Sequence, residues 1–258
     1  MRKIYKKLLS LVIFLIVTFG IMIPLYVHYT ARQFTGAYDT LLLSKHSPYD
    51  TILIEIHYQD DAMPYAASLE TLKERVENYT GKNVTVVKYP DIKGFEVSDT
   101  VEDNRVRMFG DRILQNHTQY HSGWLSGRMV IYIIYTTLNW EGNTSNSAAG
   151  ITYNADTIII FKDIVRTQEV ETPVLLHEMG HLWGLEHSNN TDDIMNVHMD
   201  EYLLSHFFNK LPDDFSENEK NILLEKHDSW LIFPVKPYES LYSAPLNRLI
   251  STKSTALS

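Results

Sequence analysis

The chain has 258 residues, 44% of them hydrophobic, and carries a formal net charge of −9 at pH 7. This length and apolar content are sufficient for one sizeable buried core and argue against wholesale disorder. The acidic balance argues against a nucleic-acid partner. The absence of cysteine excludes disulfides, thiolate catalysis and cysteine-bound zinc, so any metal site must use nitrogen and oxygen ligands.

The N-terminal segment combines a basic tail with a long apolar run. Residues 1–7 include four basic side chains, and residues 8–27 contain no charged residue. A run of about 20 residues is long enough to cross a bilayer as a helix, and basic residues before it place the N-terminus in the cytoplasm. We therefore expect a cytoplasmic tail at 1–7, a single transmembrane anchor at 8–27 and an extracytoplasmic remainder. A cleaved signal peptide, which would leave the protein secreted, is the alternative.

The part beyond the apolar run predicts one folded domain between two irregular segments. Residues 28–50 lack sustained periodicity and indicate a stalk or linker, the domain spans 51–235, and the proline-containing tail at 236–258 is expected to be irregular. Strands alternating with helices indicate an α/β (or α+β) fold. The elements expected in chain order are a strand at 51–59, a helix at 62–81, a strand at 83–90, a short helix around 106–115, a buried strand at 128–136, a polar loop at 139–147 and a strand at 157–163.

The stretch VETPVLLHEMGHLWGLEH, at 170–187, predicts a helix that ends in a sharp turn. Thr172 precedes Pro173, and a residue before proline is pushed out of the helical region, whereas proline fits the first helical position. Thr172 is thus the expected N-cap. Gly184 can adopt the left-handed conformation that ends helices, so the helix is expected to run for about three turns and to stop after Trp183.

Three histidines in this stretch have the spacing of metal ligands. His177 and His181 are four residues apart and lie on one face of the helix. Because the chain reverses at Gly184, His187 can supply a third nitrogen from a side that a continuing helix could not reach. We therefore expect one zinc ion bound by the three imidazoles, with a fourth position left for water, as in catalytic sites.

Glu178 follows the first of these ligands and is expected to point toward the open position. Zinc lowers the pKa of bound water toward neutrality. Glu178 is expected to take a proton from this water during attack on a carbonyl and then to deliver one to the departing amine. A peptide bond suits this arrangement, so the expected substrate is a peptide or protein. Histidines packed in a core, or a purely structural zinc site, are the alternatives, and neither needs Glu178.

The motif HExxHxxGxxH followed by Met195 resembles the signature of the metzincin metallopeptidases. The form HEMGHLWGLEHS, with Gly180 inside the motif and Ser188 after the third histidine, resembles the matrixin branch. The resemblance implies that Met195 forms a Met-turn beneath the zinc, packed against the ligand histidines without coordinating the metal. It also implies a metzincin-like catalytic domain with a twisted mixed sheet and an active-site helix, and a substrate peptide lying along an edge strand near 148–153.

A C-terminal helix is also implied by the resemblance, and residues 215–227 fit it, because Ser216 and Glu219 have the spacing of a capping box. The chain departs from matrixins in lacking the cysteine of a latency propeptide and a counterpart of their second zinc site between 137 and 163. A structural calcium ion at Asp192 and Asp193 is an alternative without a supporting motif. The remaining conspicuous histidines show no ligand spacing and are expected at the surface or hydrogen-bonded in the core: His117, His121, His198, His206 and His227.

Two functions remain open at this point. The first is a membrane-anchored, extracytoplasmic zinc endopeptidase. The second is a non-catalytic module, an adhesin or receptor, that binds peptides or proteins on a peptidase-like scaffold. Glu178 favours the enzyme, because a scaffold without turnover has no reason to keep it. The pattern specifies neither the physiological substrate nor the oligomeric state.

Overall fold

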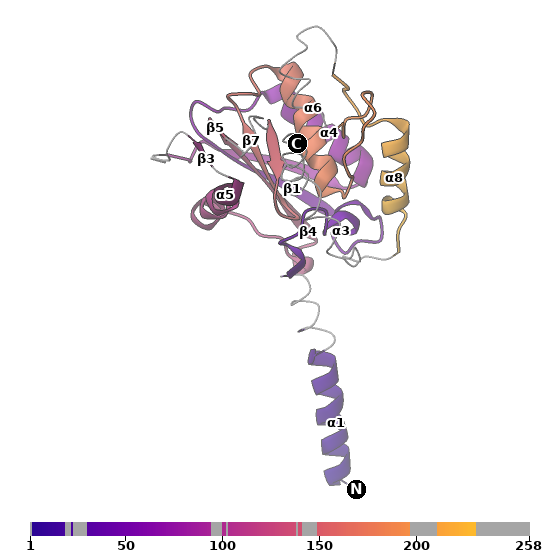
Figure 1. Cartoon of the computed structure of the whole chain (residues 1–258). Coiled ribbons are helices and arrows are strands. Elements are labelled where there is room, and N and C mark those ends of the chain that lie inside the picture. The colour runs from indigo at the N-terminus through magenta and orange to yellow at the C-terminus, as the bar shows by residue number, and fades with distance from the viewer. Residues whose placement is uncertain are drawn as a thin grey trace, which may run out of the picture.

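The computed structural model describes residues 2–18, 22, 30–93, 100–101, 103–137, 139–140, 149–196 and 211–230. Figure 1 shows the arrangement of the elements in space. In chain order these are α1 (Arg2–Val17), α3 (Asp39–Leu43), β1 (Thr51–Tyr58), α4 (Ala66–Thr80), β2 (Asn83–Tyr89), β3 (Thr100–Val101), α5 (Asp103–His117), the 3₁₀ turn η2 (Trp124–Ser126), β4 (Arg128–Thr136), β5 (Asn139–Trp140), β6 (Gly150–Thr152), β7 (Thr157–Phe161), α6 (Gln168–Leu182) and α8 (Glu217–His227).

The central sheet has five strands in the order β2-β1-β4-β7-β6. The first four run parallel, whereas β6 pairs antiparallel with β7 and forms one edge. Strand β4 lies in the middle of the sheet and is buried over almost its whole length, as expected for a parallel strand covered on both faces. The predicted α/β fold with a mixed sheet is confirmed, and the edge strand lies inside the range 148–153 predicted for it.

Helices cover both faces of the sheet (Figure 1), with α4 and α6 on one face and α5 on the other. Side chains of β1 alternate between two separate hydrophobic clusters, so that Ile54 packs with the α4 and α6 side while Leu53 packs with the α5 side. The larger cluster includes the buried Leu175 and Leu176 of α6. Packing of α6 on the sheet therefore fixes the helix that carries the histidine motif.

The prediction of a stalk at 28–50 was wrong for the described part of that range, residues 30–50. Tyr38, Leu42 and Leu43 are buried in the main hydrophobic cluster, and α3 begins within this segment. The buried Lys82 donates from Nζ to the carbonyl oxygens of Leu42 and Ser44, at 2.6 and 3.0 Å. This segment is therefore part of the folded domain.

The ends of the chain are described only in part. None of the helices that the structure describes is both long and apolar enough to span a membrane. The predicted span at 8–27 extends into residues outside the description, and the tail at 236–258 lies wholly outside it. The loop prediction at 139–147 was wrong for residues 139–140, which form strand β5, and residues 141–147 lie outside the description. The C-terminal helix predicted at 215–227 is confirmed as α8, and the predicted capping box of Ser216 and Glu219 is present.

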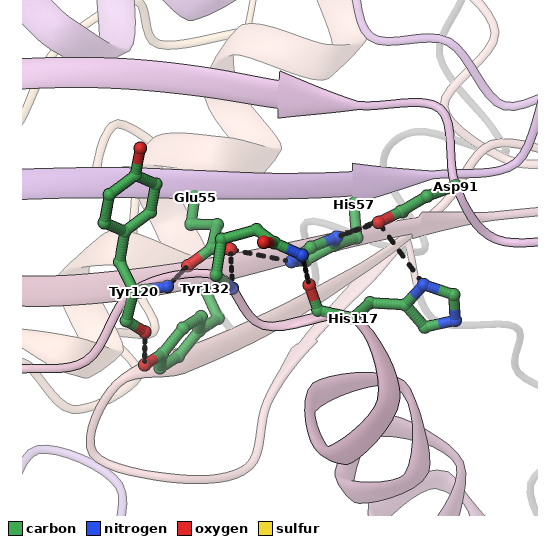
Figure 2. A network of polar contacts seen from close by, with 7 residues as sticks. Glu55, His57, Asp91, His117, Tyr120 and Tyr132 are labelled. Atoms are coloured by element: carbon green, nitrogen blue, oxygen red, sulfur yellow. Dashed lines mark hydrogen bonds and ion pairs between the residues drawn. The ribbon is translucent and has the colours of Figure 1, made fainter.

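The α5 face of the sheet contains a buried polar network that no sequence pattern indicated (Figure 2). Glu55 and His57, on β1, have completely buried side chains. His57 Nδ1 lies 3.0 Å from Oδ1 of Asp91 and Nε2 lies 3.3 Å from Oε1 of Glu55, while Nδ1 of His117 lies 3.3 Å from Oδ2 of Asp91. The network joins the end of α5 to the carboxyl ends of β1 and β2.

Candidate functional site

Helix α6 carries the histidine motif and begins earlier than predicted. It starts at Gln168, so Pro173 lies inside it and the prediction of Thr172 as N-cap was wrong. Tertiary contacts hold the extra turn, because the buried carboxylate of Glu171 accepts hydrogen bonds from the backbone N–H of Tyr65 at 2.9 Å and from Nζ of Lys162 at 2.7 Å. These contacts outweigh the preference of a pre-proline residue for extended backbone.

The helix ends in a Schellman motif centred on Gly184. Gly184 has a φ of +70°, and its N–H donates to the carbonyl of His181 at 3.0 Å, while the N–H of Leu185 donates to the carbonyl of Gly180 at 2.9 Å. This positive φ, which side chains rarely adopt, favours glycine at position 184. The chain thereby reverses direction directly before His187.

The three predicted ligand histidines converge on one point. Nε2 of His187 lies 3.2 Å from Nε2 of His177 and 3.1 Å from Nε2 of His181. These spacings are close to the roughly 3.3 Å between nitrogens bound tetrahedrally to zinc at about 2.0–2.1 Å. Among the described residues, these histidines form the one group of three or more metal-binding side chains. The predicted calcium alternative at Asp192 and Asp193 has no such group.

The protonation of the histidines favours metal binding. Nδ1 of His177 lies 2.7 Å from the carbonyl of Ile194, and Nδ1 of His181 lies 3.2 Å from the carbonyl of Leu185. An N–H donated at each Nδ1 leaves the lone pair of Nε2 for a metal. Burial lowers the pKa of His177 to about 4 and lowers the pKa of His187. Burial, reinforced by the two neighbouring histidines, holds the pKa of His181 well below its usual value. All three imidazoles are neutral at pH 7, so this donor set fits zinc.

Glu178 lies beside the histidines and contacts the edge strand. Its side chain is 5% exposed. The hydroxyl of Thr152, on β6, lies 2.7 Å from Oε2 and 2.9 Å from the backbone carbonyl oxygen of Glu178. No sequence signal indicates this contact, because Thr152 precedes Glu178 by 26 residues and belongs to another element.

Met195 is buried against the motif helix. A Cβ at Gly180 would clash with its sulfur atom, so Met195 lies against the helix between the two helical histidines. The turn that carries it is closed by the N–H of Ser188, which donates to the carbonyl of Met195 at 2.7 Å, and is held by Oε1 of Glu219, which accepts the N–H of Met195 at 2.8 Å. The role of Met195 beneath a metal stays a prediction.

The remaining predicted histidines lie away from this site. His117 belongs to the buried network on the opposite face, His227 contacts Asp228 at 3.3 Å, and His121 is exposed. His198 and His206 lie outside the described residues. None of the three described histidines therefore adds a ligand to the cluster.

Comparisons with known proteins found one family match and several similar solved structures. The family model described as Matrixin matches residues 137–219, a range that contains the three histidines, Glu178 and Met195. No curated protein matches the chain. One similar solved structure is archaemetzincin from Methanopyrus kandleri, with a TM-score of 0.48 and 15% identity, covering 69% of this chain and 96% of that one. Another is archaemetzincin from Archaeoglobus fulgidus, with a TM-score of 0.41 and 14% identity, covering 66% and 99%.

A third similar structure is a zinc-dependent peptidase from Methanocorpusculum labreanum, with a TM-score of 0.40 and 14% identity, covering 66% of this chain and 99% of that one. Because these identities are low, the assignment depends on the family match and on the site itself. The match and the cluster of His177, His181 and His187 together support a zinc-dependent peptidase, a hydrolase whose substrates are peptides or proteins.

Proposed function

We propose that this protein is a zinc-dependent endopeptidase in which Glu178 carries the protons of peptide-bond hydrolysis. The observation that carries the proposal is the convergence of three neutral imidazoles, together with the buried Glu178, which follows the first of them on α6. A structural zinc site needs a fourth protein ligand and has no use for a neighbouring carboxylate. The donor set, with three nitrogens, leaves one coordination position for the reaction.

The roles of the residues follow from their placement. A zinc ion at this site, when bound, supplies a Lewis acid that polarises a carbonyl and lowers the pKa of water. Glu178 accepts the proton of the attacking water and then donates a proton to the departing amine. His177, His181 and His187 orient this chemistry, because their Nε2 atoms face one point and two of their Nδ1 atoms are fixed by backbone carbonyls.

Strand β6 is the proposed docking edge for the substrate. It is the last strand of the central sheet, and no further strand pairs with it within the described residues. An extended peptide can add to such an edge through backbone hydrogen bonds. Because β6 contacts Glu178 through Thr152, a peptide on this edge passes beside the proposed catalytic carboxylate. An interior peptide bond fits this arrangement, which is why we propose an endopeptidase.

We also propose that the protein is anchored by residues 8–27 and acts outside the cytoplasm. The support is the sequence itself, an uncharged apolar run behind a basic tail. Two measurements test this proposal: the mass of the mature protein and its extraction from membranes. An anchored protein should be released by detergent but not by alkaline carbonate. An intact N-terminus in the membrane fraction is expected. A mature protein that begins after the apolar run and is found in the medium would contradict the anchor and indicate secretion.

The decisive test of the enzymatic proposal compares the wild-type protein with Glu178→Ala. Wild type is expected to bind one zinc ion per chain and to cleave a quenched peptide library near neutral pH. Glu178→Ala should keep the zinc but lose about 10³-fold in kcat/KM, because it removes the proton carrier. Glu225→Ala, an exposed change on α8, is the matched control and should leave cleavage unchanged. Zinc binding without any cleavage by wild type would instead favour the peptide-binding module.

A further inference from the structure

The side chain of Glu178 is held by a hydroxyl from the edge strand. Thr152 Oγ1 lies 2.7 Å from Oε2 of Glu178 and 2.9 Å from its backbone carbonyl oxygen. A hydroxyl has one proton to donate, and an ionised carboxylate is a stronger acceptor than a neutral carbonyl. With Glu178 ionised, the hydroxyl of Thr152 therefore donates to Oε2 and limits rotation of the carboxylate.

Gly150, two residues earlier on the same strand, provides the space that this position of Glu178 needs. A Cβ at Gly150 would lie 2.8 Å from Cγ, 3.0 Å from Oε1 and 3.1 Å from Cδ of Glu178. The three atoms belong to the outer half of the Glu178 side chain. Any side chain at position 150 would therefore push Glu178 away from the strand. Gly150 and Thr152, both on β6, thus lie side by side against the side chain of Glu178.

Thr152 is itself fixed by its surroundings. Its carbonyl oxygen accepts a hydrogen bond from the hydroxyl of Thr35 at 3.2 Å. On the other side, Thr152 is paired with Ile158 of β7, and the turn beyond it is closed by the N–H of Tyr153, which donates to the carbonyl of Thr157 at 3.3 Å. A β-branched residue in a strand also has few side-chain rotamers. The hydroxyl is therefore presented to Glu178 from a rigid position.

We propose that Thr152 is a positioning residue that aims the carboxylate of Glu178 for proton transfer, and that Gly150 keeps the space for it. This inference rests on the proposed function of Glu178. A proton carrier works only when it lies within hydrogen-bonding reach of the reacting atoms, and fixing it in advance lowers the entropy cost of reaching the transition state. The edge strand would thereby both align the substrate and hold the carboxylate of Glu178 beside that substrate.

The kinetic test uses the full-length protein with Thr152→Val and Thr152→Ser. Valine keeps the β-branched shape but removes the hydroxyl, and serine keeps the hydroxyl. Thr152→Val is expected to lower kcat by about 10²-fold, with KM and zinc content close to those of wild type, and Thr152→Ser should retain most of the activity. Equal kcat in wild type and Thr152→Val, or equal losses in the valine and serine variants, would overturn the proposal.

A spectroscopic test separates this proposal from the proposed function. In zinc-free protein with ¹³C-labelled glutamate, the carboxyl resonance of Glu178 is identified by its loss in Glu178→Gln. At pH 7 this resonance should move in Thr152→Val and stay near its wild-type position in Thr152→Ser. An unmoved resonance in Thr152→Val overturns the positioning role even if the enzyme is active. A protein that shows the shift but cleaves nothing would support the contact and defeat the catalytic function.

Discussion

Glycines at this site leave space for the side chains that pack against them. Gly180 lies between the two helical histidines, and a Cβ there would meet the sulfur atom of Met195 and lie 3.2 Å from Cε1 of Phe215. A glycine in a helix interior ordinarily costs roughly 1 kcal/mol relative to alanine. Its presence here is explained by the close approach of Met195 to the helix. In the same way, a Cβ at Gly150 would collide with the side chain of Glu178. Two glycines therefore leave space for two side chains of the proposed site.

Gly180→Ala is expected to destabilise the protein in spite of the better helix propensity of alanine. Overpacking of this kind costs about 1–3 kcal/mol, and the expected decrease in the free energy of unfolding is measured by urea denaturation of zinc-free protein. The double variant Gly180→Ala/Met195→Ala is the control, because removal of the Met195 side chain should abolish most of the penalty of the added methyl group. Strictly additive effects in this cycle would show that the two residues do not oppose each other.

At the scale of elements, α8 supports the site from a distance through one side chain. Glu219 is 4% exposed. Its Oε2 accepts the N–H of Ser216 at 2.7 Å, which completes the capping box, and its Oε1 accepts the N–H of Met195 at 2.8 Å. The start of α8 and the turn of Met195 thus share one carboxylate. The position of this turn matters because the carbonyl of Ile194, directly before Met195, lies at Nδ1 of His177.

Glu219→Ala is therefore expected to cost more than the loss of an ordinary helix cap. The change leaves two N–H groups without their acceptor, and a buried N–H group without a hydrogen bond costs about 1–3 kcal/mol. We therefore expect a loss of roughly 2–4 kcal/mol in the free energy of unfolding. Glu217→Ala, an exposed change in the same helical turn, should cost less than about 0.5 kcal/mol. Chemical denaturation measures both. Similar losses in the two variants would mean that the contact with Met195 contributes nothing.

How accurately each helix or strand was predicted depends on the sequence pattern that marks it. Strands β1 and β4 were predicted within one residue of their bounds, because β1 is rich in β-branched residues and β4 is an almost continuous apolar run, both of which are typical of buried strands. Helix α3 was missed, because its five residues are too short to show a period. The start of α6 was misplaced, because the contacts of Glu171 with Tyr65 and Lys162 come from distant parts of the chain.

The same distinction applies to the candidate site. The convergence of His177, His181 and His187 follows from spacing within one helix and its turn, which sequence alone contains. The contact of Thr152 with Glu178 depends on how the edge strand packs on α6. That packing is a property of the folded sheet and leaves no local pattern. For the same reason the sequence identified the proposed catalytic groups but not the residues around them.

At the scale of the whole molecule, the two faces of the sheet respond to pH in opposite ways. The buried location of His57 lowers its pKa, but its close contacts with the carboxylates of Glu55 and Asp91 outweigh this effect, so the pKa is raised above the ordinary value of 6.5. His177 and its neighbours, on the α6 face, have lowered pKa values because of burial. In zinc-free protein, acid therefore strengthens the network on one face while it destabilises the histidine cluster on the other.

The contribution of His57 can be isolated with His57→Gln. A group whose pKa is raised by folding binds its proton more tightly in the folded state, so its stabilising effect is fully present below the unfolded pKa of about 6.5 and is lost as the pH rises through the folded pKa. The difference in unfolding free energy between wild type and His57→Gln should thus be larger at pH 5.5 than at pH 9. Urea denaturation of zinc-free protein at both pH values measures it. His121→Gln removes an exposed imidazole and is the control. A difference that grows toward pH 9 would contradict a charged His57 between Glu55 and Asp91, and would mean that the network in Figure 2 holds a neutral imidazole instead.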